Sequence, residues 1–462
     1  MFRSKNIDMT KGPIFQSIIA YSLPLIFSGV LQIFFNAADL AIVGNFAGEN
    51  ATIATAAVGA TGAFIALIVN TVMGLSAGVN VTLARSIGAG DDDKTSKIVH
   101  TAMLVSLISG ILVGILGFSI SPLAMKITKC PQESLSRAIL YLRIYFAGCP
   151  AIFVYNFGSA ILRTKGDTKR PLNFLLIAGI INVILNLIFV TVFEMDAGGV
   201  ALATTISQCV AAFLTVRCLM FQNDATRYNI RQSKIYKTEF LSIVRYGLPS
   251  GLTNAMYCFA NIQIQSAING FGPSAVAGNS AVSSLEGFIM SVYSAMNASA
   301  IAFIGQNIGA GNKQRIKKVM FYCIIISIAS SIIMGYAIYF IGEPLYKIYV
   351  PKDAEAIRIA VLKGQILLTT YFMLALSQIL GAISQAFGYA MSITTISVIG
   401  IFGLRTVWMN TVFPYFNNPP LCDAALKSIY WCFPASWVLI AIGNGLVLIF
   451  AYSRYLKKGL VK

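Results

Sequence analysis

Long apolar stretches dominate this chain, and each is long enough to cross a lipid bilayer. They lie at 14–44, 53–83, 96–120, 134–162, 171–193, 199–221, 241–270, 276–305, 316–341, 356–387, 391–416 and 428–453. Hydrophobic residues make up 57% of the 462 residues and charged residues only 11%, with a mean hydropathy of +0.75. Because so little charge cannot cover a water-exposed surface, the sequence predicts an all-α polytopic membrane protein with twelve transmembrane helices.

The sequence also repeats itself at nearly half its length. Residues 85–90 (Arg-Ser-Ile-Gly-Ala-Gly) end one apolar run, and residues 306–311 (Gln-Asn-Ile-Gly-Ala-Gly) end another. Tyr-Ser-Leu-Pro at 21–24 likewise matches Tyr-Gly-Leu-Pro at 246–249. Such doubling is typical of proteins built from two related helix bundles. The pattern predicts two parallel six-helix repeats, with an N-terminal lobe over 1–222, a cytoplasmic linker over 223–239 and a C-terminal lobe over 240–462.

The distribution of basic residues predicts the topology. The net charge is +17, and the lysines and arginines form short clusters between the apolar runs rather than one basic face. This distribution argues against a nucleic-acid partner. With the N-terminus inside, most of the clusters fall on the inner side, which predicts a multi-pass protein of the cell membrane with both termini cytoplasmic. Cys130, Cys422 and Cys432 fall near the predicted outer side, and whether two of them form a disulfide bond is left open.

The motifs of soluble enzymes are not supported by their context. Residues 74–78 spell G-x-S-x-G, but they lie inside an apolar run, and the single histidine, His100, lies in the next run. The sequence contains neither a P-loop nor H-E-x-x-H. We therefore expect no enzyme activity and no cofactor, and any uphill transport would draw on an ion gradient.

Ionisable residues inside apolar runs are the first functional candidates, because burying charge in a membrane is costly. Asp39 and Glu286 are the two acids well inside such runs. Asp39 can bind a cation, accept a proton or pair with a basic ligand; alternatively it is a partly solvated acid near an outer helix end. Glu286 can instead form an internal salt bridge, with Arg405 as the expected partner. Arg143 and Lys363 occupy matched positions, and we expect both to reach toward the membrane interface.

The sequence resembles the multidrug and toxic compound extrusion (MATE) antiporters over essentially its whole length. The matching residues are Leu-Pro at 23–24, Leu-Gln at 31–32, Asn36, Asp39, Val-Gly at 43–44, Gly-Asp-Thr at 166–168, Pro171 and the segment 305–311. The resemblance implies a V-shaped pair of six-helix lobes that opens to either side in turn. It also implies export of bulky, often cationic or aromatic compounds in exchange for Na⁺ or H⁺. The alternative is a flippase for lipid-linked or polysaccharide precursors with the same architecture, which a cleft lined by several cations would favour.

Cation-site positions of this family carry over to the N-terminal half. The family pattern N-x-x-L-D is similar to Asn-Val-Ile-Leu-Asn at 182–186, so the second acid is replaced by Asn186. The resemblance then implies one oxygen-lined site for Na⁺ or a proton, formed by Asp39, Asn182, Asn186 and Thr204. The missing second carboxylate argues against a paired-acid proton relay but leaves a single-acid relay open. Alternatively, the two asparagines simply hydrogen-bond between helices.

Substrate contacts are expected from aromatic, methionine and polar side chains near the seam between the lobes. The candidates are Gln32, Phe34, Tyr155, Met256, Tyr257, Glu286, Met290, Tyr293 and Arg405. The expected partners are small organic substrates and the lipid bilayer, and the chain is expected to be monomeric.

Overall fold

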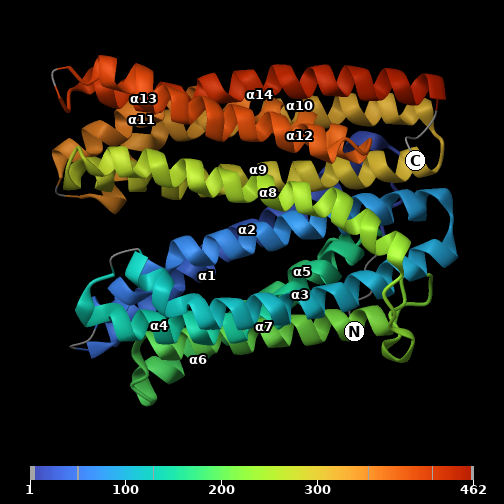
Figure 1. Cartoon of the computed structure of the whole chain (residues 1–462), viewed down its shortest axis with the longest axis horizontal. Helices are drawn as coiled ribbons and strands as arrows, with labels where there is room; N and C mark the ends of the chain where they lie inside the picture. The colour runs from blue at the N-terminus through green and yellow to red at the C-terminus, as the bar shows by residue number, and fades with distance from the viewer. Residues whose placement is uncertain (1–5, 49–50, 128–129, 352, 419, 459–462) are drawn as a thin grey trace. The chain divides into compact units, whose positions relative to one another are not determined.

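The computed structural model describes residues 6–48, 51–127, 130–351, 353–418 and 420–458. All regular secondary structure in these residues is helical (Figure 1), which confirms the predicted all-α fold class. Residues 1–5 and 459–462, which contribute to the topology prediction, lie outside the described residues. Cys130, Cys422 and Cys432 are free cysteines.

The first unit contains the described residues of Met1–Asp8 and Phe27–Leu248. Its helices are the later part of α1 (Ile14–Phe46), α2 (Ala51–Ala89), α3 (Asp92–Ile127), α4 (Gln132–Ala147), α5 (Cys149–Thr164), α6 (Lys169–Leu187) with a π-helical segment at Ile188–Val192, α7 (Asp196–Met220) and the start of α8 (Lys237–Asn269). α4 and α5 bend by 46° at their junction, where Gly148 is followed by Pro150. Two clusters of buried apolar side chains form the core of this unit.

The second unit contains Met9–Ile26 and the described residues of Pro249–Lys462. Besides parts of α1 and α8, its helices are α9 (Pro273–Gly309), α10 (Lys313–Tyr349), α11 (Ala354–Ala386), α12 (Ala390–Ser397), a π-helical segment at Val398–Gly403, α13 (Leu404–Phe416) and α14 (Asp423–Lys458). They run alongside one another in Figure 1. In the core, the ring of Tyr371 stacks on Trp437 with centroids 5.4 Å apart.

The helical segments follow the predicted apolar runs, but fewer of them qualify as membrane spans. Among the described residues, ten helices are long and apolar enough to cross a membrane, and the bent pair α4–α5 makes an eleventh. α8 is as long as α1, with 33 residues each, but does not qualify. The polar side chains of Asn254, Gln263, Gln265 and Asn269 lower its hydropathy. Length and composition thus support ten or eleven spans in the described residues, and α8 lies at the remaining predicted run, 241–270.

Packing divides the chain at two points inside helices, near Pro24 in α1 and at Pro249 in α8. The start of α1 therefore belongs to the second unit, where Asn307 donates a hydrogen bond of 2.9 Å from Nδ2 to the carbonyl of Met9. The predicted lobe limits at 222 and 240 follow the loops of the sequence and stay a prediction.

The start of α8 belongs to the first unit because two glycines let the helices approach closely. A Cβ atom on Gly78 of α2 would lie 2.2 Å from the carbonyl oxygen of Ile243, and one on Gly247 would lie 2.5 Å from the carbonyl of Leu75. The G-x-S-x-G motif thus ends in a glycine that this helix contact requires.

The segment between α7 and α8 packs on α3. The backbone N–H of Asn229 donates to Nε2 of His100, and that of Tyr236 donates to the hydroxyl of Thr101, both at 3.1 Å. Partial burial would raise the pKa of Asp224 in this segment, but hydrogen bonds from Lys165 and Thr226 outweigh it and lower the pKa below its ordinary value. These contacts attach the segment to the first unit.

Candidate functional site

Three helices of the first unit bring polar side chains to one buried point. Asp39 lies on α1, Asn182 and Asn186 lie on α6, and Thr204 lies on α7. The two asparagines are four residues apart and therefore face the same side of α6. The structure thus brings together all four residues of the predicted ion site, whose role in coupling stays a prediction.

Hydrogen bonds connect these four side chains. Asn186 donates from Nδ2 to Oδ1 of Asp39 at 2.5 Å, and the Thr204 hydroxyl donates to Oδ2 of the same carboxylate at 3.5 Å. Nδ2 of Asn182 donates to the Thr204 hydroxyl at 3.2 Å, and Nδ2 of Asn186 lies 3.3 Å from Oδ1 of Asn182. Each oxygen of the carboxylate therefore faces a neutral donor.

The carboxylate lacks a positive counter-charge. Asp39 is 9% exposed, Asn182 5% and Asn186 0%. Within the described ranges, no lysine or arginine forms an ion pair with Asp39. A charge buried in a membrane helix without a partner is costly, so such a group tends to take up a proton or bind a cation.

One buried oxygen of the cluster has no hydrogen-bond partner. It is Oδ1 of Asn186, on the same amide whose nitrogen faces Asp39. Rotating this amide by half a turn would exchange the two atoms and present the oxygen to Asp39. The oxygen could then accept a hydrogen bond from a protonated Asp39 or bind a cation held by the carboxylate. The same side chain therefore fits both charge states of the acid.

The donor set suits a hard cation or a proton. It consists of a carboxylate, two amide oxygens and a hydroxyl, and oxygen is the ligand atom that hard cations prefer. Among the described residues, no group of three or more His, Cys, Asp or Glu side chains could hold a metal ion.

Glu286 in the second unit has a different partner from the one predicted. Lys363 of α11 lies 3.2 Å from its Oε1 and 3.3 Å from its Oε2, and the same ammonium group donates to the Ser283 hydroxyl at 2.8 Å. Lys363 is 3% exposed, so the expectation that it reaches the interface is wrong. Hydrogen-bond acceptors on the neighbouring helix α9 hold the ammonium group inside the protein.

Arg405 does not pair with Glu286, which corrects the second half of that expectation. Its Nη1 donates to Oδ1 of Asn261 at 3.1 Å, its Nε donates to the Ser436 hydroxyl at 3.3 Å, and its guanidinium lies 4.4 Å from the ring centre of Phe433. The residue is 1% exposed. Its charge is therefore balanced by neutral oxygens and an aromatic face.

The remaining substrate candidates differ in exposure and belong to separate units. Tyr155 and Tyr293 are buried, and their hydroxyls donate to the carbonyls of Pro171 at 3.3 Å and Tyr371 at 3.1 Å. Phe34 and Met290 are exposed. Gln32, Phe34 and Tyr155 lie in the first unit, and Met256, Tyr257, Glu286, Met290, Tyr293 and Arg405 lie in the second. Their role in substrate binding stays a prediction.

Two residues near Asp39 and Glu286 were not linked to these acids by sequence reasoning. Tyr141 of α4 is 5% exposed and close enough to Asp39 to interact electrostatically. Lys363 was noticed but was not linked to Glu286. Lys363 could be noticed in the sequence because it is a basic residue inside an apolar run. Tyr141 could not, because nothing in the sequence separates it from the other 19 tyrosines of the chain.

A sequence model of the MatE family matches residues 24–188 and 249–409, which together make up more than half of the chain. The chain belongs to the MatE family. The two matched stretches begin at Pro24 and Pro249, the equivalent prolines of the doubled sequence. The two-repeat organisation of this MatE chain is thereby confirmed, and Asp39 lies in the first matched stretch.

Relatives and solved structures agree with this assignment. The "Probable multidrug resistance protein YpnP" of Bacillus subtilis is 28% identical over 405 residues, which cover 87% of this chain and 89% of the relative. A FAD transporter of Shewanella oneidensis is 27% identical over 346 residues, covering 74% and 75%. The structure of an outward-facing multidrug resistance MATE family transporter of the MOP superfamily matches with a TM-score of 0.88 at 20% identity, covering 99% of this chain and 100% of that chain. The structural match shows that the fold is shared.

Proposed function

We propose that this MatE chain is a membrane transporter that exports small organic compounds in exchange for Na⁺ or H⁺, which binds at Asp39. The observation that carries the proposal is a buried carboxylate held by neutral donors, without a lysine or arginine ion-paired to it in the described residues. The names of relatives support an export role, since YpnP is named a multidrug resistance protein and the Shewanella protein a FAD transporter. A transport role also fits a chain without recognisable enzyme motifs.

Ion binding can drive the transporter because the site joins α1, α6 and α7. An ion that binds one arrangement of these helices more tightly than another shifts the equilibrium toward the first. Moving a two-state equilibrium from 1:99 to 99:1 needs about 10⁴-fold tighter binding, or about 5.5 kcal/mol. A carboxylate that loses its charge inside a membrane is a source of free energy of this order.

The alternative function, a flippase for lipid-linked or polysaccharide precursors, would need several cations to bind phosphate. Lys363 is neutralised by Glu286, which weakens this reading. Arg405 has no acidic partner among the described residues, which is the observation in its favour. We therefore retain the flippase as the second candidate.

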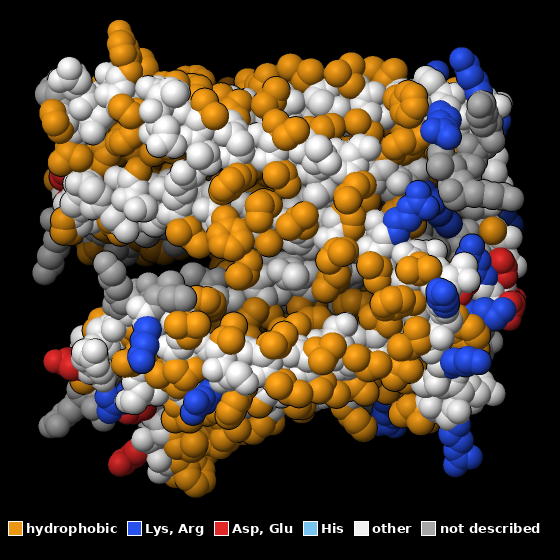
Figure 2. All heavy atoms as spheres, in the orientation of Figure 1, with side chains coloured by type: hydrophobic (Ala, Val, Ile, Leu, Met, Phe, Trp, Pro, Cys, Tyr) orange, Lys and Arg blue, Asp and Glu red, His pale blue; other side chains and the backbone are white. Residues whose placement is uncertain are grey.

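The proposed location is the cell membrane, with both termini cytoplasmic. Figure 2 shows lysine and arginine side chains gathered at one end of the helices of the second unit, whereas in the first unit they lie at both ends but are denser at one. For the first unit, this is the end that carries the segment between α7 and α8 (Figure 1). The gathering supports assigning that end to the cytoplasm.

Proteoliposomes loaded with a fluorescent cationic dye test the proposal. A sodium gradient and a pH gradient are imposed separately, and dye movement is followed for the native chain and for Asp39→Asn. We expect one gradient to drive the native chain, and the substitution to reduce transport to the level of empty liposomes. Equal transport by Asp39→Asn would contradict the role of Asp39, and failure of both gradients with any organic cation would favour the flippase.

A further inference from the structure

Arg405 of α13 is a buried cation without an acidic partner in the part of the chain that the structure describes. It is 1% exposed, and no aspartate or glutamate there forms an ion pair with it. The ionisable side chains that interact with it electrostatically are Tyr257, Tyr371 and Cys432, none of which carries a carboxylate. A guanidinium stays charged inside a protein, so an unpaired one within a membrane helix marks a candidate functional site.

Hydrogen bonds use only part of this guanidinium. Its Nε donates to the Ser436 hydroxyl at 3.3 Å, and its Nη1 donates to Oδ1 of Asn261 at 3.1 Å. The ring of Phe433 lies against one face, with its centre 4.4 Å away. A guanidinium has five N–H groups, and Nη2 donates to none of the described residues. The edge formed by Nη1 and Nη2 therefore retains N–H groups for a further acceptor.

The helices that form this cluster correspond to the helices of the Asp39 site. Asn261, Arg405 and Ser436 lie on α8, α13 and α14, which contain the first, fifth and sixth predicted spans of the second repeat. The Asp39 site is formed by α1, α6 and α7, which contain the first, fifth and sixth predicted spans of the first repeat. A π-helical segment adjoins each cluster, and such segments are frequent at functional sites.

The two corresponding clusters carry opposite charges. In the first unit, amide and hydroxyl groups surround the carboxylate of Asp39. In the second unit, an amide and a hydroxyl surround the guanidinium of Arg405. Such neutral groups present either a donor or an acceptor, and a half-turn of the Asn261 amide would direct its Nδ2 toward an anion next to Arg405. The first cluster suits a cation, and the same construction around a cationic side chain suits an anion.

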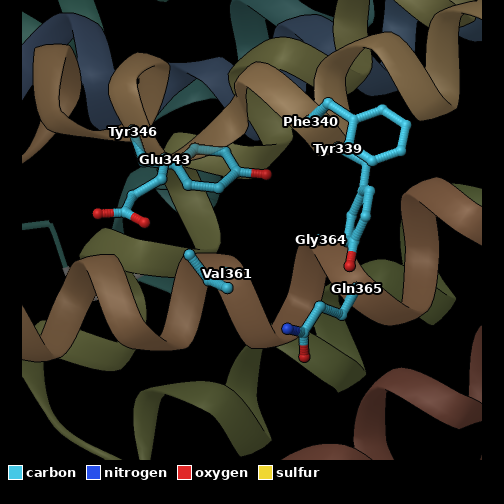
Figure 3. Close-up of a pocket in the computed structure, with 7 residues that line it drawn as sticks. All are labelled: Tyr339, Phe340, Glu343, Tyr346, Val361, Gly364 and Gln365. Atoms are coloured by element: carbon cyan, nitrogen blue, oxygen red, sulfur yellow. The ribbon is translucent and has the colours of Figure 1, made fainter.

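Other features of the second unit do not meet this need. Glu286 is paired with Lys363 at 3.2 Å, and the buried Tyr371 interacts with both Glu286 and Arg405. Figure 3 shows a pocket of about 290 Å³ between α10 and α11, whose lining residues include the acid Glu343 but no lysine or arginine. An anion would therefore be repelled in that pocket and attracted at Arg405.

We propose that Arg405, Asn261 and Ser436 form a binding site for a carboxylate or phosphate group. A planar guanidinium offers parallel N–H groups that match two oxygens of such an anion. Because Arg405 is buried, the anion enters when α13 moves relative to α8 or α14, as helices do during a transport cycle. The group belongs either to a free inorganic ion or to an exported organic compound, and the second case rests on the proposed export function.

Binding to the purified full-length protein in a non-ionic detergent tests the site. Equilibrium dialysis with radiolabelled phosphate measures binding of a free ion. Fluorescence titration with a naphthalene carboxylate measures binding of an organic anion, and the neutral naphthalene carboxamide is its matched control. Tighter binding of phosphate identifies an inorganic ion, and tighter binding of the carboxylate identifies an organic compound. Arg405→Gln should weaken binding of the preferred anion at least about tenfold, because charge-assisted hydrogen bonds are lost.

Asn261→Asp gives the decisive result, because it supplies Arg405 with a permanent acidic partner. We expect anion affinity to fall at least about tenfold while the melting temperature rises, since a buried charge that had no counter-charge gains one. A merely structural role of Arg405 would not join a gain in stability to a loss of anion binding. Asn261→Ser, which adds no charge, is the control and should retain binding.

Three results would overturn the proposal. They are undiminished anion binding by Arg405→Gln or Asn261→Asp, absence of binding of both anions by the native chain, and equal binding of the carboxylate and the carboxamide. Asp39→Asn should leave anion binding unchanged, because Asp39 belongs to the other unit. A failure of the ion-coupling proposal is therefore distinguishable from a failure of this one.

Discussion

Each unit holds an acid within a long apolar helix, Asp39 buried and Glu286 half-buried, but the surroundings of the two acids are opposite. Asp39 in the first unit faces amide and hydroxyl donors. Glu286 in the second unit faces the ammonium group of Lys363. A carboxylate that is already paired gains little from another cation, whereas one with neutral partners can exchange ions. The comparison therefore supports the proposal that ions exchange at Asp39, whereas Glu286 belongs to a charge pair.

The difference between the two acids is informative because the two units share features of their helical architecture. Both units carry a π-helical segment in their fifth predicted span, at Ile188–Val192 and at Val398–Gly403. Asn186 lies two residues before the first segment and Arg405 two residues after the second. Such segments often occur at functional sites because they disturb the regular helix locally. Both repeats share this irregularity, while the side chains next to it differ.

Giving Asp39 the kind of partner that Glu286 has should produce the largest effect. Thr204→Lys would place an ammonium group next to the carboxylate, and the resulting pair would compete with the coupling ion. We expect gradient-driven dye efflux to fall to background in proteoliposomes. Thr204→Ser, which keeps the hydroxyl, is the control and should retain efflux. Full efflux by the lysine variant would show that transport does not require Asp39 to lack a basic side-chain partner.

Removing the partner of Glu286 should cost stability. Lys363→Met leaves the half-buried carboxylate of Glu286 without its cation, and we expect a loss of about 3 kcal/mol in the free energy of unfolding, the low end of the range for buried pairs. Denaturant titration in detergent measures the change. The double variant Lys363→Met/Glu286→Gln should recover most of it, because no unpaired charge remains. A double variant as unstable as the single one would indicate that packing dominates over charge.

Changing the amide next to Asp39 should reveal which ion is exchanged. Asn186→Ala removes both a donor to the charged carboxylate and an amide oxygen, and a hydrogen bond to a charged group contributes about 1.5–3 kcal/mol. Proton affinity should rise about tenfold, since the charged form loses a donor, whereas sodium affinity should fall, since a ligand oxygen is lost. Ion dependence of efflux measures both. An unchanged ion dependence of efflux would show that Asn186 takes no part in ion binding at Asp39.

The corresponding helices α4 and α11 also begin differently, and this should produce the smallest effect. α4 starts after Pro131 without a side-chain cap, whereas Asp353 caps α11 by accepting a hydrogen bond of 2.9 Å from the backbone N–H of Ala356. That bond, together with one from Ser274, holds the pKa of Asp353 below its ordinary value.

The sign of the pH dependence follows from this lowered pKa. The stabilising contribution of Asp353 is present above the pKa of the unfolded chain and is lost as pH falls through the lower pKa of the folded protein. Asp353→Ala should therefore lower the melting temperature slightly at neutral pH and have no effect in strong acid. Thermal unfolding at several pH values measures this, and a difference that persists in acid would contradict it.

Much of the fold and of the candidate site could be predicted from the sequence. Long apolar runs give helices in a membrane because each helix satisfies its own backbone hydrogen bonds. Asp39 stands out as an acid inside an apolar run, the spacing of Asn182 and Asn186 places both on one side of a helix, and resemblance to a family supplied the grouping of these residues with Thr204. The structure brings these four residues together, although no contact between separate helices follows from spacing alone.

The partners of the buried charges could not be predicted, because the sequence gives the depth of a residue but not the direction its helix faces. Glu286 and Arg405 looked like a pair on depth and charge, yet Lys363 is the residue that reaches the acid. The expected snorkelling of Lys363 failed for the same reason, since the acceptors on α9 become visible only when α9 and α11 pack together.

The sequence by itself determined that this chain is helical, membrane-spanning and doubled, because hydropathy and repeats depend on residue types and their order. Tertiary structure alone decided that α1 and α8 are each divided between the two units, and that one buried acid is paired while the other is not. These features depend on which helix faces meet and how closely. That geometry follows from packing across distant parts of the chain, with glycines such as Gly78 permitting the closest contacts.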